Sequence, residues 1–246
     1  MRDTKEIVST LRTPRGRANH AVPVCAPLNL PALDLPIQPY TLGAWLGDGT
    51  SLTGQVCGID AEVFQEIESE GYTVSGGYYQ KKLAVRTVRG LVTALRSNHL
   101  LGNKHIPSKY LRASYSQRLS LLQGLMDTDG HADKKSGYCE FCTIDQQFGK
   151  QVYELVVSLG IKASIRESDA KIYGRITSKR YRVCFTTSQP VFRLKRKLDR
   201  LPKKIRRTTQ FRYIVGAKRL GVEHMQCLQV DSPRRATSVV SLFLSI

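Results

Sequence analysis

The sequence contains no run of apolar residues of about 18 or more, the length that a membrane-spanning helix needs. Residues 1–10, MRDTKEIVST, also lack the hydrophobic core of a signal peptide. We therefore expect neither a membrane association nor secretion. The expected location is intracellular, in the cytoplasm or with the nucleoid.

Cysteine is sparse and scattered, with six residues in the chain. Scattered cysteines in a reducing compartment behave as small hydrophobic residues, so we expect no disulfides. Cys139 and Cys142 form a lone C-x-x-C, but no second ligand pair stands at zinc-finger spacing. Because YCEFCT alternates like a strand, strand packing is favoured over a zinc site for this pair.

Acidic residues are few: 20 Asp and Glu stand against 38 Lys and Arg, which gives a formal net charge of +18. Such an excess predicts a polyanionic partner. Nucleic acid is favoured over an anionic membrane surface or a ribosomal neighbour. With 246 residues and 41% hydrophobic content, the chain can form one large or two small globular domains.

One pattern occurs twice, as TLGAWLGDG at 41–49 and LQGLMDTDG at 122–130. Each copy has a glycine at its third place, Gly43 or Gly124, and an acid at its eighth, Asp48 or Asp129, and both pairs are 81 residues apart. Similar series of helix and strand patterns follow both copies. The sequence therefore predicts an α+β fold of two pseudo-symmetric αββαββα repeats, with antiparallel sheets.

A glycine inside a helix costs about 1 kcal/mol relative to alanine, and close approach of a second helix is a sufficient reason for it. We expect Gly43, Ala44 and Gly124 to form the interface between the two motif helices. Asp48 and Asp129 would then lie together at helix C-termini, where negative charge is disfavoured. Mg²⁺ or Mn²⁺ would relieve this repulsion, with further ligands from the backbone carbonyls of Gly47 and Thr128. The alternative is that Asp-Gly marks a surface turn. This explanation suits a single copy, but it accounts less well for two copies at the same place in a repeat.

The strand-like segments alternate apolar residues with basic ones. In RYRVCFTT, for example, Arg180 and Arg182 alternate with Tyr181, Val183 and Phe185. A solvated sheet face usually mixes both charges, whereas this one is mostly basic, as expected for a β-ribbon that enters the DNA major groove. The expected DNA-binding residues are Lys82, Arg86, Lys162, Arg166, Arg180 and Arg182.

These motifs resemble those of the LAGLIDADG homing endonucleases, of the single-chain kind that carries two copies. The second copy is a near match, while the first is looser, with Leu46 where the family has Asp. The resemblance covers about residues 40–215. It implies motif helices at the interface, sheets that form a DNA-binding saddle, and Asp48 and Asp129 as catalytic, metal-binding acids. It also implies a monomer that cuts both strands of a long asymmetric DNA site and leaves 3′ overhangs.

Intein-embedded members of this family place a lysine near each acid, which implies Lys104 in NKHIPSKYL as one catalytic residue. LPKKIRR offers Lys203 and Lys204 for the other, and Lys204 is preferred, although a phosphate-contacting run explains that segment equally well. The flanks RANHAVPV and MQCLQVDSP are similar to those of inteins in replicative helicases. Because no Cys or Ser opens the chain and no His-Asn closes it, we do not expect splicing.

The resulting domain prediction is an extended, intein-like arm at 1–39, repeats at 40–113 and 114–215, and a C-terminal remnant at 216–246. Two other functions remain open. A non-cleaving nucleic-acid-binding protein of the same fold, such as a regulator or an RNA maturase, would need neither acid. A structural ribonucleoprotein component would bind with a steep salt dependence and without metal-dependent hydrolysis.

Overall fold

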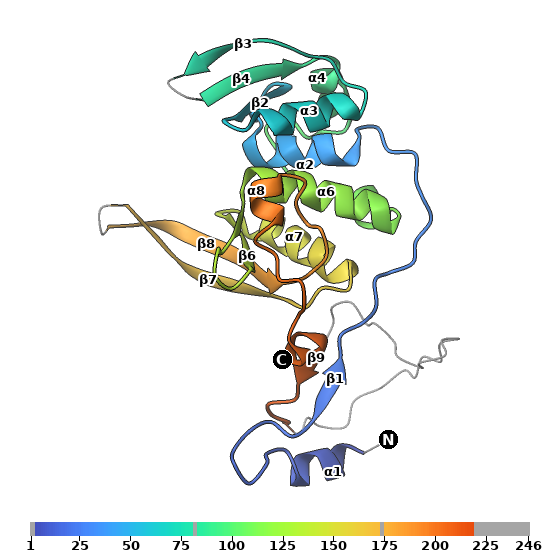
Figure 1. The fold of residues 1–246 in the computed structure, drawn as a ribbon, viewed down its shortest axis with the longest axis vertical. Coiled ribbons are helices and arrows are strands. Elements are labelled where there is room, and N and C mark those ends of the chain that lie inside the picture. The colour runs from blue at the N-terminus through green and yellow to red at the C-terminus, as the bar shows by residue number, and fades with distance from the viewer. Residues whose placement is uncertain (1–2, 81–82, 173–174, 219–246) are drawn as a thin grey trace. The chain divides into compact units, whose positions relative to one another are not determined.

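The computed structural model describes residues 3–80, 83–172 and 175–218. Its contacts divide the chain into two units (Figure 1). Residues 27–205 form one unit, and residues 1–26 form the other together with residues 206–246. The central segment of the sequence therefore folds as one body, while the two ends of the chain share the second.

The first half of the larger unit begins with the helix of the first motif, α2 (Pro39–Asp48), whose N-terminal turn starts at a proline. It continues through β2 (Gln55–Gly58), α3 (Ala61–Ser69), β3 (Val74–Gln80), β4 (Leu83–Val88) and α4 (Leu91–Ser97). The strands form an antiparallel sheet in the order β2-β4-β3.

The second half follows a short helix, α5 (Ser108–Leu111). The second motif lies in α6 (Tyr115–Thr128), which begins with a capping box between Ser114 and Gln117. The elements after it are β5 (Gly130–Ala132), β6 (Tyr138–Thr143), α7 (Gln146–Ser158), β7 (Ala163–Ile172), β8 (Arg175–Thr186) and α8 (Lys195–Leu198). The sheet is antiparallel in the order β5-β6-β8-β7.

The expected α+β class with antiparallel sheets is confirmed, but the two halves differ in one strand. The second half has the order αββαββα, whereas the first lacks a strand directly after its motif helix. A single bridge between Gly49 and Val56 takes the place that the β5–β6 pair occupies in the second half. The predicted order αββαββα is therefore wrong for the first half, where pairing after the motif helix stops at this one bridge.

Helix α7 covers one face of the four-stranded sheet and leaves the other open. Asp145 caps this helix by accepting a hydrogen bond from the Phe148 backbone N–H at 2.9 Å. The ring of Phe148 packs edge-on against Phe141 of β6, with centroids 5.7 Å apart. Val183 and Phe185 of β8 share this buried face. The alternating residues of β8, including Arg180 and Arg182, therefore lie on the open face, as the sequence pattern predicts.

The smaller unit contains α1 (Thr4–Ser9), β1 (Ala21–Pro23), a 3-10 helix at Arg207–Gln210 and β9 (Phe211–Tyr213). Strands β1 and β9 pair antiparallel. The expectation of an arm without helices was wrong at Thr4–Ser9, because Asp3 and Glu6 form a capping box that stabilises a short helix. Residues 219–246, which make up most of the predicted C-terminal remnant, lie outside the described residues. No helix in the described ranges is long and apolar enough to cross a membrane.

Candidate functional site

The two motif helices, α2 and α6, pack backbone to backbone, between the three-stranded and the four-stranded sheet (Figure 1). A Cβ atom added to Gly43 would overlap the Leu121 carbonyl oxygen and lie 3.1 Å from the Gly124 Cα. A Cβ added to Gly124 would overlap the Tyr40 carbonyl oxygen and lie 2.7 Å from the Ala44 backbone nitrogen. Only glycine at both positions permits this close approach, which brings the C-terminal ends of the two helices together.

Asp48 ends α2, and Asp129 is the C-terminal capping residue of α6. Burial, followed by the negative charge of Asp129, raises the pKa of Asp48 to about 6. Burial also raises the pKa of Asp129, although one side of this residue is open to solvent. Both carboxylates therefore lie close to one another at helix ends that already carry partial negative charge.

Lys104 reaches the end of α2 from the loop that follows α4. Its Nζ donates to the carbonyl oxygens of Leu46 and Gly47, both at 3.1 Å, and of Gly49 at 2.6 Å. Burial lowers its pKa, while the charges of Asp129 and Asp48 oppose this effect. The structure thus brings Lys104 to the two acids, where the sequence motif suggested it would be.

Lys197 of α8, rather than Lys204, reaches the end of α6. Its Nζ donates to the carbonyl oxygens of Met126, Asp127, Thr128 and Gly130, at 2.9, 2.7, 3.2 and 2.8 Å. Only 7% of Lys197 is exposed, and burial lowers its pKa to about 8. Lys204, by contrast, is exposed and has no hydrogen bond to either motif among the described residues.

The sequence around Lys197 has the apolar residues of a segment that packs against the core. In VFRLKRKL the apolar residues Val191, Phe192 and Leu194 are buried, so a lysine three residues after Leu194 lies in a segment packed against the core. This lysine was expected after the last helix of the second half, in LPKKIRR, whereas Lys197 lies in α8, six residues before Lys203 and seven before Lys204.

The expected carbonyl ligands, Gly47 and Thr128, lie at the helix ends beside the acids. Each already accepts a hydrogen bond from a lysine ammonium group, at 3.1 Å and 3.2 Å. A carbonyl oxygen has a second lone pair, but a nearby cation disfavours a metal ion there. The two carboxylates fit a divalent cation better, because burial disfavours the ionised form of both and the charge of Asp129 further disfavours that of Asp48.

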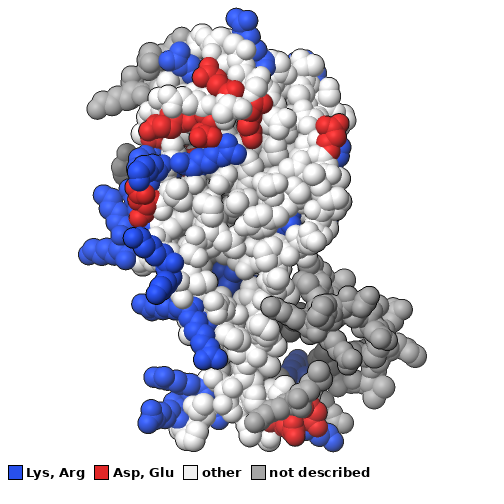
Figure 2. Space-filling view, turned by 45° about the vertical axis from the view of Figure 1, so that its right-hand side comes forward, with Lys and Arg blue, Asp and Glu red and all other residues white. Residues whose placement is uncertain are grey.

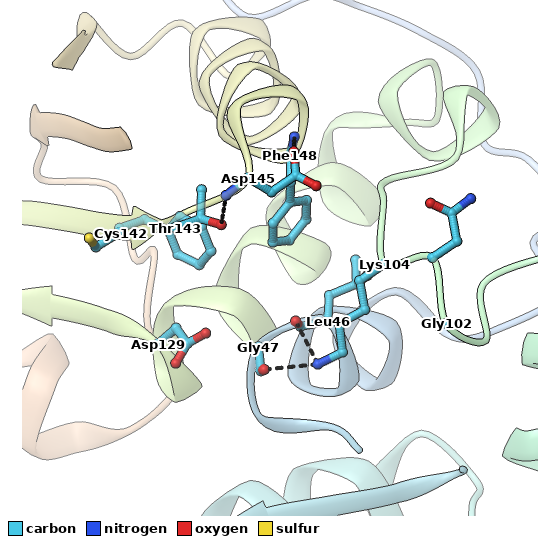
Figure 3. A pocket seen from close by; sticks show the side chains of 11 residues that line it. Leu46, Gly47, Gly102, Lys104, Asp129, Cys142, Thr143, Asp145 and Phe148 are labelled. Atoms are coloured by element: carbon cyan, nitrogen blue, oxygen red, sulfur yellow. Dashed lines mark hydrogen bonds between the residues drawn. The ribbon is translucent and has the colours of Figure 1, made fainter. Parts of the chain in front are cut away.

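A cavity of about 300 Å³ opens beside Asp129 and Lys104. Asp129, at the end of α6, and Lys104 both face this space (Figure 3). Asn103 from the same loop and Thr143 and Asp145 from the β6–α7 junction complete its polar lining. The cavity therefore gives water or a polar ligand access to one side of the acid pair.

The open face of the four-stranded sheet carries the predicted arginines. Arg166 on β7 pairs in register with Arg182 on β8, and Ser168 pairs with Arg180. Arg166 is exposed, while Arg182 is half-buried and forms an ion pair with Glu140 of β6 at 3.5 Å. In Figure 2 lysine and arginine side chains gather along one margin of the face drawn.

The other predicted basic residues are distributed differently. Lys82 lies outside the described residues. Arg86 lies on β4 of the smaller sheet and donates to the Gly76 carbonyl oxygen at 3.5 Å. Lys162 directly precedes β7 and is half-buried. Only Arg166, Arg180 and Arg182 are therefore brought together on one sheet.

The C-x-x-C pair does not form a metal site. Cys139 is fully buried against the core, whereas Cys142, an odd number of residues later in the same strand, is exposed on the opposite face. Within the described ranges, no three His, Cys, Asp or Glu side chains are grouped to hold a metal ion. Strand packing therefore explains these cysteines.

Comparison with known proteins gives two matches to this chain's sequence. Residues 116–199 match the model of a family described as a LAGLIDADG-like domain. A replicative DNA helicase DnaB of Mycobacterium intracellulare is 36% identical over 237 residues, which are 94% of this chain and 39% of that protein. The chain thus spans about two fifths of the length of this curated relative.

Solved structures of I-DmoI are also similar to this chain. Mesophilic variants of the homing endonuclease I-DmoI match with a TM-score of 0.43 and 15% identity, over 61% of this chain and 83% of theirs. I-DmoI in complex with DNA and Mn has the same TM-score and identity, over 61% and 89%. I-DmoI in complex with DNA and Ca matches with a TM-score of 0.43 and 14% identity, over 67% and 86%.

Proposed function

We propose that this chain, which carries a LAGLIDADG-like domain at residues 116–199, is a single-chain homing endonuclease with two LAGLIDADG motifs. It hydrolyses one phosphodiester bond in each strand of a long, asymmetric DNA site and leaves 3′ overhangs. The observation that carries this proposal is the pair of acids, Asp48 and Asp129, which end two closely packed helices and interact electrostatically.

The lysines support an arrangement of two related half-sites. Lys104 binds the carbonyl oxygens of residues 46, 47 and 49, and Lys197 binds those of 127, 128 and 130, each 81 residues later, as well as that of 126. Each motif therefore holds one lysine in the same way. We infer that the two halves are related by a pseudo-twofold axis, which suits the antiparallel strands of a duplex.

The donor set of the site fits a hard divalent cation, Mg²⁺ or Mn²⁺, held by Asp48 and Asp129. When bound, the cation lowers the pKa of a water molecule and neutralises charge on the phosphate. The carboxylates would hold it at the helix ends, and the second lone pair of the Gly47 or Thr128 carbonyl oxygen could add a ligand.

The lysines supply positive charge beside the reacting phosphate. A pKa of about 8 keeps Lys197 mostly protonated at pH 7, so it can donate a hydrogen bond to an oxygen that gains negative charge. Lys104 would do the same in the other half-site. The backbone carbonyls that hold each ammonium group limit its movement, which lowers the entropic cost of placing it.

The open face of the four-stranded sheet is the proposed DNA-binding surface. Arg166, Arg180 and Arg182 lie on adjacent strands, and a β-ribbon of this kind fits the major groove. The smaller sheet would bind the other half of the site and complete a saddle. Because both motifs lie in one chain, we propose that the enzyme acts as a monomer, inside the cell where it meets DNA.

An intein origin is supported by the relationship to a helicase and by the arrangement of the chain ends. The relative is a replicative helicase of which this chain matches only a part. The ends of the chain, at 1–26 and 206–246, form a unit separate from the one that carries the motifs. We propose that this unit derives from a splicing domain, while the motif-bearing unit cuts DNA.

The test is a cleavage selection on a library of long random duplexes, in Mg²⁺ and in EDTA, followed by sequencing of the cut ends. The expected result is a defined site with 3′ overhangs in Mg²⁺ only. Asp48→Asn and Asp129→Asn should each lower cleavage by at least ~100-fold, while a variant of the partly exposed Asp133, Asp133→Asn, should cut normally. Equal cleavage by wild type, Asp48→Asn and Asp129→Asn would refute the proposal. Binding without any cleavage would favour a regulator or an RNA maturase.

A further inference from the structure

A buried carboxylate outside the proposed catalytic pair holds the start of α8. Asp127 of α6 is 1% exposed and is not one of the two acids at the helix ends. Its oxygens accept hydrogen bonds from the backbone N–H of Arg193 at 3.1 Å and of Leu194 at 3.2 Å. The Tyr40 hydroxyl donates to the same carboxylate at 2.9 Å. Asp127 thus caps the turn whose next residues lead to Lys197.

The Arg193 side chain fixes the same segment from the other side. Its Nη1 forms an ion pair with Glu66 of α3 at 2.7 Å, and its Nε donates to Gln123 of α6 at 3.0 Å. Its guanidinium also stacks on the Tyr40 ring of α2, 4.2 Å from the centroid. Three helices therefore contribute to holding residues 193–197.

The ion pair between Arg196 and Asp60 completes this clamp. Asp60 is the N-terminal capping residue of α3, but its carboxylate binds the Arg196 guanidinium instead of the helix N-terminus. Arg196 directly precedes Lys197. The segment that carries the lysine of the second half is thus bound to a helix of the first half.

The segment that carries Lys104 is held by other groups: the Ile106 backbone N–H donates to Gln151 of α7 at 2.9 Å, and the Gly102 backbone N–H donates to the Ser51 carbonyl oxygen at 2.8 Å. In the first motif the place equivalent to Asp127, two residues before the acid, is taken by Leu46. The apolar side chain of Leu46 is buried and offers no acceptor. Asn103, the residue before Lys104, lines the open cavity with Asp145, whose carboxylate caps α7. The two half-sites therefore differ in the groups that hold each lysine, and a carboxylate in the place of Asp127 is present only in the second.

We propose that Asp127 is a positioning residue for Lys197, and that only the strand cut in the Lys197 half-site depends on it. Without this carboxylate, two buried backbone N–H groups lose their acceptor, and the segment opens toward solvent. Lys197 then leaves the carbonyl oxygens at the end of α6, while Lys104 stays in place. The strand-specific part of this inference rests on the proposed function.

The first experiment measures lysine position without any need for cleavage. Wild type, Asp127→Ala and Leu122→Ala are labelled with trace acetic anhydride, and the acetylation rates of Lys197 and Lys104 are read by tandem mass spectrometry. Leu122→Ala is the control, because it loosens the core of α6 without removing any of the hydrogen bonds or ion pairs that hold residues 193–197. We expect Asp127→Ala, which leaves no side-chain acceptor, to accelerate labelling of Lys197 by about 10-fold or more, with Lys104 within twofold of wild type. Unchanged Lys197 labelling, or the same acceleration at Lys197 in Leu122→Ala, would overturn the proposal.

The second experiment uses the selected DNA target, with each strand end-labelled separately. Lys197→Met and Lys104→Met identify the strand that each half-site cuts. Asp127→Ala should slow cleavage of the strand affected by Lys197→Met by about 10-fold or more and leave cleavage of the other strand within twofold of wild type. Equal slowing of both strands would overturn the strand-specific claim. If wild type cuts no DNA, the proposed function fails, whereas the labelling result still decides whether Asp127 positions Lys197.

Discussion

Two aspartates determine the electrostatics of the site, and their effect on stability can be measured without DNA. Burial and the charge of Asp129 raise the pKa of Asp48 from 3.8 to about 6. The folded state therefore prefers the protonated carboxyl. The stability that this preference contributes is fully present below pH ~4 and is lost as the pH rises through about 6.

Asp48→Asn should consequently stabilise the metal-free protein at pH 7.5. A neutral amide imitates the protonated acid, and after a discount for partial exposure the gain should be about 1–2 kcal/mol in the free energy of unfolding. Chemical denaturation between pH 4 and pH 8, in EDTA and in Mg²⁺, would measure this effect. The variant should also gain less stability from Mg²⁺ than wild type does.

Asp133→Asn is the matched control, with the opposite expected sign. Hydrogen bonds from Ser136 lower the pKa of this partly exposed acid, so its contribution is present at neutral pH and is lost as the pH falls. No gain in Asp48→Asn would show that the ionised form of Asp48 is not disfavoured, and an equal gain in Asp133→Asn would show that the effect does not come from the burial of Asp48.

Among single residues, the sequence identified the two acids and Lys104, but not Lys197 or the residues that hold Lys197. Asp48, Asp129 and Lys104 stand in recognisable motifs. The position of Lys197 depends on the path of the chain after β8. The segment from β8 to Lys197 differs in length from the segment from β4 to Lys104, so sequence spacing could not identify Lys197. Asp127 lies in the second motif, LQGLMDTDG, but its partners are backbone N–H groups 66 and 67 residues away, which no local pattern indicates.

At the scale of elements, the contact between α2 and α6 determines where both acids lie. A Cβ at Gly124 meets backbone atoms of Tyr40, Gly43 and Ala44, and none of these can rotate away. Gly124→Ala should force the helices apart at a cost of about 3 kcal/mol, and alanine's helix propensity should offset about 1 kcal/mol of this. We expect a net loss of about 2 kcal/mol, which lowers the melting temperature by about 4–8 °C.

Gly149→Ala in α7 is a control for the same substitution inside a helix. Its nearest neighbours are side-chain atoms of Tyr181, Thr143 and Ile165, at 3.2 to 3.5 Å, which can adjust. Its melting temperature should stay within about 3 °C of wild type. Calorimetry on both variants tests the prediction, and equal melting temperatures for Gly124→Ala and wild type would mean that the helices do not touch through their backbones.

Strand alternation allowed most elements of the larger unit to be predicted from sequence, and the helices followed from capping residues and apolar periodicity. Two elements were not predictable in this way. The missing strand after α2 depends on a turn that leaves only one bridge, at Gly49 and Val56. The pairing of β1 with β9 joins residues about 190 positions apart, and no local pattern indicates such a partner.

At the scale of the whole molecule, the charge is uneven along the chain. The unit at 1–26 and 206–246 has 12 Lys and Arg against 4 Asp and Glu, while the larger unit at 27–205 has 26 against 16. Both parts are therefore basic, and the smaller one has the higher charge per residue. Binding to DNA should accordingly release many counterions and weaken steeply as salt rises.

Arg166 and Arg112 offer a matched comparison that separates the sheet surface from general positive charge. Arg166 is exposed on the open face of β7, whereas Arg112, 56% exposed in its side chain, is paired with Glu154 of α7, the helix that covers the opposite face. Arg166→Ala should weaken DNA binding and reduce the slope of log K against log salt by about 1, the value for one lost phosphate contact. Arg112→Ala removes the same formal charge and should leave that slope unchanged.

Fluorescence anisotropy with a long duplex, in Ca²⁺ and over a series of salt concentrations, measures both slopes. The two variants have the same net charge, so any difference between them reflects position. If both variants lower the slope equally, binding depends on overall charge, and the open sheet face is not the surface that contacts the phosphates. A smaller slope in Arg166→Ala alone would locate the DNA on the sheet face opposite α7, which also carries Arg180 and Arg182.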